Sequence, residues 1–302
     1  MGRRPELSLK LLHTFMALAR ELHFGRAAES LGMAQPALSQ QIRRVEQIVG
    51  CLLLDRDTRN VQLTPAGALL RDMAEHILAE ASRGLDQVRR AGRGETGTLT
   101  IGFTATTSLH ELPSIMQAHR ARFPDVETTL VELLPDALVE MLLGSHIDAG
   151  LARELLPHAG MTSVPLRYEP YVVVLPSNHP AAQHEDEIAL ESLCDEAFIL
   201  FPRDQASGNV ACILETCAAS GFVPRIVQEA PSWQTAVSLV GSGLGVTILP
   251  ECTSSLALPG VVYRRIDSPR RSQIMLVHRT ADKRPLVCHF LETALSTAVA
   301  DS

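Results

Sequence analysis

Apolar residues at the start of the chain recur every three or four positions and predict three helices. Ser8 precedes the first helix as a cap. The apolar residues of that helix are Leu11, Leu12, Phe15, Leu18, Ala19 and Leu22. A second helix is expected over 26–31, before Gly32, and a third from Gln35 to about Val49. A short helix, a tight turn with glycine and a longer helix form a helix-turn-helix.

The third helix carries apolar residues on one face and hydrogen-bonding residues on the other. Its apolar face consists of Leu38, Ile42, Val45 and Val49. The opposite face consists of Pro36, Ser39, Gln40 and Arg43. A purely structural helix is expected to fill its free face with Glu and Lys, whereas amide, hydroxyl and guanidinium groups suit base edges in a major groove. This face therefore predicts contact with double-stranded DNA.

Two short apolar runs around the polar segment 55–60 predict a small β-hairpin, or wing, after the third helix. Arg56 and Arg59 lie at its tip. An arginine on such a projection can enter the narrow minor groove or clamp a phosphate. The alternative is that these arginines pair at the surface with Asp55 and Asp57.

A single apolar stripe then continues along a long helix, which we place at 65–92. The stripe consists of Leu70, Met73, Ile77, Ala81, Leu85 and Val88. A long helix with one narrow stripe usually pairs with another, so we expect a homodimer or homotetramer; packing onto its own domain is the alternative. Two copies would supply recognition helices for two half-sites roughly 34 Å apart on DNA. Arginines and glycines at 93–98 predict a hinge.

From residue 99 onward, short apolar runs alternate with helical patterns. The runs are 99–103, 128–132, 149–151, 171–175, 198–201, 226–228, 246–249 and 274–277. This alternation predicts an α/β domain with parallel sheets, in which ligands bind at the C-terminal ends of the strands.

Polar residues follow several of these predicted strands. Hydroxyls at 104–108 stand between the first strand and a helix, where exposed helix amides favour an anion such as a carboxylate. Residues 132–136 repeat this junction, and Arg153 follows the third strand. The alternative is that the threonines only cap a helix. Trp233 begins a later helix, either lining a cleft or packing in a core.

Charge is distributed unevenly along the 302 residues, whose net charge is −7. Up to Arg71, ten basic and six acidic residues give a net charge of +4, so the remainder carries −11. A basic head on an acidic body is typical of a DNA-binding module joined to a domain that does not bind DNA. The hydrophobic content of 46% is sufficient for two or three domains.

Signals for other chemistry are weak. The six cysteines lack the paired spacing of a metal or thioredoxin-type site, the eleven histidines are scattered, and no Gly-x-Ser-x-Gly occurs. We expect no metal, no cofactor and no catalysis. No run approaches the ~18 apolar residues of a membrane span, and residues 1–6 do not lead into the apolar run that a signal peptide needs. We therefore expect a cytoplasmic protein without a membrane partner.

Several motifs in the N-terminal region occur together in the order of a known family. They are Phe24-Gly25-Arg26-Ala27-Ala28-Glu29, Gln35-Pro36-Ala37-Leu38-Ser39-Gln40-Gln41-Ile42, then Leu53, Arg56, Arg59 and Leu63-Thr64-Pro65-Ala66-Gly67. Over about sixty residues this resembles the N-terminal signature of LysR-type transcriptional regulators. The family usually has a serine or threonine cap where Ala34 stands here, which removes a phosphate contact, and often has phenylalanine where Leu54 stands.

The resemblance implies a role for each matching residue of the DNA-binding head. It implies that the third helix meets the major groove and that Arg56 meets the adjacent minor groove. The candidate DNA-binding residues are Gln35, Pro36, Ala37, Ser39, Gln40, Arg43, Arg56 and Arg59.

More diffusely, the resemblance implies a multidomain α+α/β fold. A winged helix-turn-helix at 1–64 and a dimerisation helix would precede a two-lobed effector domain, similar to periplasmic binding proteins, at 99–302. Lobe I is expected at 99–165 and 268–302, and lobe II at 166–267. The candidate effector-binding residues are Thr104, Thr106, Thr107, Ser108, Pro135, Arg153, Phe201, Pro202, Asn209 and Trp233.

The sequence thus predicts a transcription regulator that senses a small carboxylate. The arrangement is similar to regulators of aromatic-compound breakdown, which sense benzoate- or muconate-like acids, although Pro135 stands where a hydroxyl would suit such a ligand better. The expected partners are promoter DNA, the effector and a second copy, with RNA polymerase a further candidate. Two alternatives remain open: a redox sensor using Cys212 or Cys217, and a DNA-binding head fused to an enzyme.

Overall fold

The computed structural model describes residues 6–57, 60–183, 187–202 and 207–300. The chain divides into one unit up to Arg90 and a second from Ala91. Each unit encloses its own clusters of buried apolar side chains. None of the described helices combines the length and apolar composition needed to cross a lipid bilayer.

The N-terminal unit is a helical domain with a β-hairpin. Its elements are α1 (Leu9–Glu21), α2 (Phe24–Ser30), α3 (Gln35–Val49), β1 (Leu54–Asp57), β2 (Asn60–Leu63) and α4 (Pro65–Gly92). The Leu11 N–H donates to the Ser8 hydroxyl, which caps α1. Ala34 gives α3 no side-chain cap, and Pro36 occupies the first turn instead.

The core of this unit lies between the three short helices and the start of the hairpin. Its fully buried side chains include Phe15, Leu18, Leu38, Ile42, Val45 and Leu53. The apolar face predicted for α3 therefore packs inward, except for Val49, which is exposed because it ends the helix. In the hairpin, β1 and β2 pair antiparallel, with Leu54 opposite Leu63.

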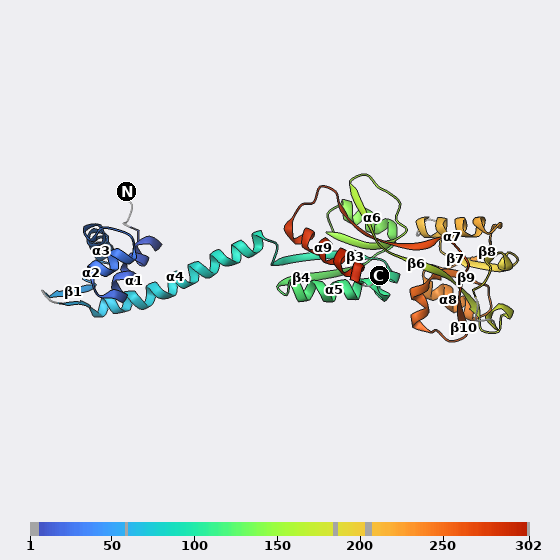
Figure 1. Cartoon of the computed structure of the whole chain (residues 1–302), viewed down its shortest axis with the longest axis horizontal. Coiled ribbons are helices and arrows are strands. Elements are labelled where there is room, and N and C mark those ends of the chain that lie inside the picture. Colours follow the sequence, from blue (N-terminus) through green and yellow to red (C-terminus); the bar gives the residue numbers. More distant parts are fainter. Residues whose placement is uncertain (1–5, 58–59, 184–186, 203–206, 301–302) are drawn as a thin grey trace. The chain divides into compact units, whose positions relative to one another are not determined.

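Helix α4 continues beyond the core of the N-terminal unit (Figure 1). Leu70 and Ala74 near its start are buried against that core. The exposed apolar residues of the helix are Leu69, Met73, Ile77, Leu85 and Val88. Most of the apolar stripe predicted from the sequence thus lies on the outside of this unit.

The C-terminal unit alternates strands with helices. Its elements are β3 (Gly97–Phe103), the 3-10 helix η1 (Ala105–Leu109), α5 (Glu111–Arg122), β4 (Val126–Glu132), α6 (Pro135–Leu143), β5 (Ala149–Arg153), β6 (Met161–Pro176), η2 (Pro180–Gln183), η3 (Leu190–Leu193), β7 (Ala197–Leu200), α7 (Ser207–Ala219), β8 (Arg225–Glu229), α8 (Trp233–Gly241), β9 (Thr247–Pro250), η4 (Glu251–Leu256), β10 (Val261–Arg265), β11 (Arg271–Arg279) and α9 (Pro285–Ala300).

The expectation of purely parallel sheets is wrong. Strand β3 pairs parallel with β4 and β5, and β7 pairs parallel with β8, but β11 runs antiparallel to both β5 and β6. The 16-residue β6 also pairs antiparallel with β9 and β10. The sheet is mixed because β6 carries the chain out of one lobe and β11 returns it alongside.

Two lobes result from this path (Figure 1). Lobe I packs α5 and α9 against its strands around Leu99, Ile101 and Phe290. Lobe II has cores around Phe198 and Trp233. The lobe boundaries drawn from the sequence fall within β6 and just before β11.

Candidate DNA-reading helix and ligand cavity

The N-terminal half of α3 presents its polar face to solvent. Gln35, Pro36, Ala37, Gln40 and Arg43 are exposed, and Ser39 is half-buried. None of the described residues forms an ion pair with Arg43. Arg56 lies in β1, but its side chain and the whole of Arg59 fall outside the described part of the structure. The pairing considered for them with Asp55 and Asp57 therefore stays a prediction.

Two side-chain hydrogen bonds hold α3 in place. The Leu53 N–H donates to Glu46 Oε1 at 3.1 Å, which ties the end of α3 to the start of the hairpin. The Thr14 hydroxyl donates to Gln41 Oε1 at 2.8 Å, which ties α1 to α3. Sequence reasoning missed Glu46, since a lone glutamate on a helix gives no signal that it is 8% exposed. These bonds orient the exposed face as one rigid surface.

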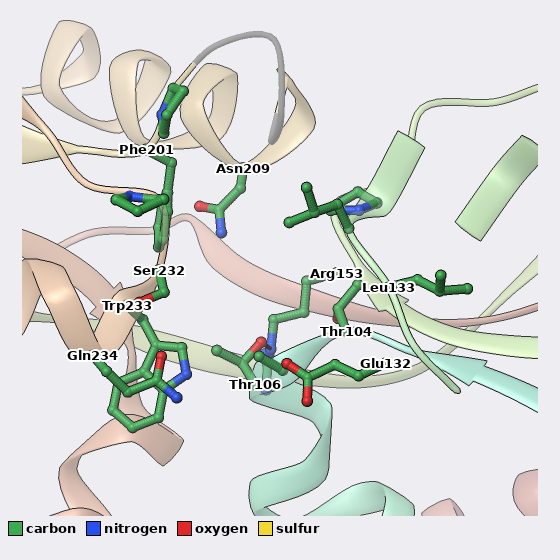
Figure 2. Close-up of a pocket in the computed structure, with 15 residues that line it drawn as sticks. Thr104, Thr106, Glu132, Leu133, Arg153, Phe201, Asn209, Ser232, Trp233 and Gln234 are labelled. Atoms are coloured by element: carbon green, nitrogen blue, oxygen red, sulfur yellow. Dashed lines mark hydrogen bonds between the residues drawn. The ribbon is translucent and has the colours of Figure 1, made fainter. Parts of the chain in front are cut away.

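A cavity of about 320 Å³ lies between the two lobes of the C-terminal unit (Figure 2). Eight of the ten residues expected there line it: Thr104, Thr106, Pro135, Arg153, Phe201, Pro202, Asn209 and Trp233. The lining residues that sequence reasoning did not assign are Ala105, Glu132, Leu133, Leu134, Pro231, Ser232 and Gln234. For Pro231, Ser232 and Gln234, the available signal in the sequence was the Pro231-Ser232 pair, which directly precedes a helix.

Thr107 and Ser108 are not among the lining residues, contrary to the expectation. Both lie on η1, where their hydroxyls turn back to the chain. Thr107 is fully buried and donates to the Thr104 carbonyl, and Ser108 donates to the Ala105 carbonyl. This local turn uses the hydroxyls that the sequence suggested for an anion.

Arg153 sits at the wall of the cavity in a buried polar cluster, and its side chain is 3% exposed. Its guanidinium forms an ion pair with Glu169 and lies 4.0 Å from Glu111. It also donates to Thr106 Oγ1 at 3.0 Å and to the hydroxyl of Ser272. Burial raises the pKa of Glu111, although the nearby Arg153 opposes this. The positive charge of Arg153 is therefore already matched inside the protein.

The cysteines proposed for redox sensing are buried thiols, and Cys212 also accepts a hydrogen bond from Arg270, which opposes the rise of its pKa. Cys212 donates to Glu154 Oε2 at 3.1 Å, and burial raises its pKa to about 11. Cys217 is fully buried on the same helix, α7, and burial raises its pKa to about 11 as well. Because the thiolate is the reactive form, such thiols are poor nucleophiles at neutral pH. This geometry does not favour the redox alternative.

The sequence matches two protein-family models that together span most of the chain. Residues 9–68 match the bacterial regulatory helix-turn-helix of the lysR family, and residues 92–298 match the LysR substrate binding domain. The chain belongs to the LysR family of transcriptional regulators. This confirms the expected fold class, a winged helix-turn-helix joined to an α/β effector domain, and the expectation of a DNA-binding transcription regulator.

Individual relatives agree. The chain is 35% identical to the transcriptional regulator AlsR of Bacillus subtilis, covering 94% of each protein, and 30% identical to XapR of Escherichia coli, covering 96% of this chain and 98% of XapR. It is also similar to full-length CbnR in complex with its target DNA, with a TM-score of 0.80 and 25% identity over 97% of this chain and 100% of CbnR. These relatives are regulators, so this LysR-family protein is not an enzyme, and the fused-enzyme alternative is wrong.

Proposed function

We propose that this LysR-family regulator reads promoter DNA with the exposed face of α3 and changes that reading when a small carboxylate-bearing effector occupies the cavity. The observation that carries the proposal is a cavity whose wall comes from both lobes and contains buried polar atoms without partners in the described structure. A ligand that contacts both lobes can favour one arrangement of the domain over another, which is the requirement for a switch.

The DNA-binding residues proposed are those of the exposed α3 face together with Arg56 and Arg59 on the hairpin. Gln35 and Gln40 carry amides that can bind an adenine edge in a bidentate manner, and Arg43 can contact a guanine or a phosphate. The exposed apolar stripe on α4 supports pairing of two copies, as a homodimer or within a homotetramer. Two copies would address two half-sites, and RNA polymerase is a further candidate partner.

The apolar part of the effector would lie between aromatic and aliphatic surfaces. Phe201 and Trp233 face the cavity from lobe II, and Leu133 and Leu134 line it from lobe I. Two ring surfaces favour a planar body, which keeps an aromatic acid among the candidate effectors. Pro135, also in the lining, supplies an apolar contact where an acid would gain more from a hydroxyl.

Substitutions of two glutamines on α3 test whether this helix contacts DNA bases. Gln35→Ala should weaken binding to a duplex selected from a randomised library by about 5- to 150-fold, since a bidentate base contact contributes ~1–3 kcal/mol. The same variant should bind an unrelated duplex as the parent chain does, because phosphate contacts remain. Fluorescence anisotropy at one fixed salt concentration measures both.

Gln47→Ala is the matched control, because Gln47 is also exposed but lies toward the C-terminal end of α3. It should leave both affinities unchanged. Equal binding of the selected duplex by Gln35→Ala and by the parent chain would contradict the groove assignment.

A further inference from the structure

Three buried polar atoms that belong to cavity-lining residues have no hydrogen-bond partner among the described residues. They are Thr104 Oγ1 at the end of β3, Asn209 Oδ1 on α7 and Trp233 Nε1 at the start of α8. Thr104 is 7% exposed and Trp233 is 4% exposed. Leaving such a group unpaired costs ~1–3 kcal/mol. Their convergence on one space indicates a ligand that supplies the missing hydrogen bonds (Figure 2).

The type of each atom specifies part of that ligand. An indole N–H can only donate, so the group next to Trp233 must be an acceptor. The Thr104 hydroxyl can donate to the same kind of group. The Ser232 hydroxyl is already engaged with Thr235, because it accepts from the Thr235 N–H and shares a hydrogen bond with the Thr235 hydroxyl. A carboxylate, with two acceptor oxygens, meets both donors.

The charges around the cavity specify a second group of the ligand. Among the described residues that line the cavity, Arg153 is the one with a positive charge, and Glu169 already pairs with it. Glu132, the last residue of β4, also lines the cavity, and no ion pair or hydrogen bond to its carboxylate occurs within the described residues. Figure 2 draws its side chain among the residues that line the cavity. Glu132 is exposed, so the described lining carries, on a side open to solvent, a carboxylate without an ion-pair partner, which attracts a cation and repels another carboxylate.

We infer that the effector is a small amine-bearing acid, a zwitterion whose carboxylate accepts from Trp233 Nε1 and the Thr104 hydroxyl and whose ammonium donates to Glu132. Asn209 Oδ1 accepts a further hydrogen bond from the ligand. A dicarboxylate of the same size is disfavoured because it would place a second negative charge near Glu132. The inference rests on the proposed function, since it assumes that this cavity is the effector site.

The test compares amino acids with the same molecules lacking one charged group. The full-length chain is titrated with the common α-amino acids, with ω-amino acids such as 4-aminobutyrate, and with the corresponding deaminated acids and dicarboxylates. At about 5 mM, at least one amino acid should raise the melting temperature. Calorimetry should show that its deaminated acid binds at least about tenfold more weakly, since about 1.4 kcal/mol separates them.

Two variants assign the recognition to residues. Glu132→Gln should reduce the preference for the amino acid over its deaminated acid to less than about threefold. Glu127→Gln is the matched control, because Glu127 lies on the same strand outside the lining and should keep the preference. Trp233→Phe should weaken binding of the amino acid by about fivefold or more, as expected when a hydrogen bond to a charged group is lost. Unliganded melting temperatures and far-ultraviolet circular dichroism establish that each variant is folded.

Three results would overturn the inference: no amino acid binds, a deaminated acid binds as tightly as its amino acid, or Glu132→Gln keeps the full preference. Failure of the proposed function is distinguishable. If acids without an amine bind and alter DNA affinity, the cavity is still the effector site and only the zwitterion is wrong. If no compound of either kind alters DNA affinity, the effector-responsive function is wrong as well.

Discussion

In Gly67→Ala, the N-terminal unit is expected to unfold at a lower denaturant concentration. The free energy of unfolding should fall by about 3 kcal/mol, which is at the upper end of the cost of overpacking. A Cβ at this position, in the first turn of α4, would lie 2.0 Å from the carbonyl oxygen of Leu53. Leu53 cannot easily move away, because its N–H donates to Glu46 and its carbonyl accepts from the Thr64 N–H at 3.0 Å. The clash is with backbone, so no rotamer change relieves it.

Urea unfolding followed by circular dichroism at the helical minimum measures this loss. Trp233, the single tryptophan of the sequence, belongs to the C-terminal unit, so its fluorescence should report an unchanged transition in the same sample. Gly84→Ala on the same helix is the control, because nothing lies within 4 Å of a Cβ there. That variant should be as stable as the parent or more so. An unchanged helical transition in Gly67→Ala would show that α4 does not approach the hairpin this closely.

Arg153→Met is expected to cost about 3–5 kcal/mol of C-terminal stability, because it leaves buried carboxylates without their counter-ion. Glu169 and Glu111 have side chains that are 10% and 7% exposed, so solvent cannot replace the guanidinium. Urea unfolding followed by Trp233 fluorescence measures the loss. Arg122→Met is the control, since the Arg122–Glu292 pair is exposed and should contribute only about 0–1 kcal/mol.

The same variant should have a characteristic pH dependence. Burial already raises the pKa of Glu111, and losing Arg153 removes a charge that opposes this. The folded variant then holds this proton more tightly than the unfolded chain does. Its deficit relative to the parent should be largest at neutral pH and should shrink as pH falls from the raised pKa toward the ordinary pKa of glutamate. A deficit independent of pH, or as small as that of Arg122→Met, would contradict the buried cluster.

Local signals explain what the sequence predicted well. The bounds of α3 follow from Pro36 at its start, the spacing of Leu38, Ile42 and Val45, and Gly50 at its end, all of which act within the helix itself. The exposed stripe on α4 is likewise a matter of spacing along one helix. In contrast, the strand β10 was missed and the sheet was expected to be parallel, because both depend on pairing with β6, which is distant in sequence.

The cavity was predicted in its location but not in its electrostatics. Arg153 was named as a candidate effector-binding residue after a strand, yet Glu169 on β6 pairs with its charge through a contact that no motif indicates. Thr107 and Ser108 were misassigned because the 3-10 turn of η1 uses their hydroxyls. Glu132 belonged to a junction noted in the sequence, but its unmatched charge becomes visible only when the lining is assembled.

The central claim is that occupancy of the cavity changes how α3 reads DNA. The most direct measurement is a hydroxyl-radical footprint of the full-length chain on a selected duplex, with and without each amino acid and each deaminated acid at about 5 mM. The account predicts that at least one compound alters the protected positions, because ligand and DNA affinities are coupled reciprocally. In Trp233→Phe the change should require a higher concentration of the compound, by about fivefold or more. If the footprint with every compound is identical to the footprint without it, the claim that cavity occupancy changes DNA reading is contradicted.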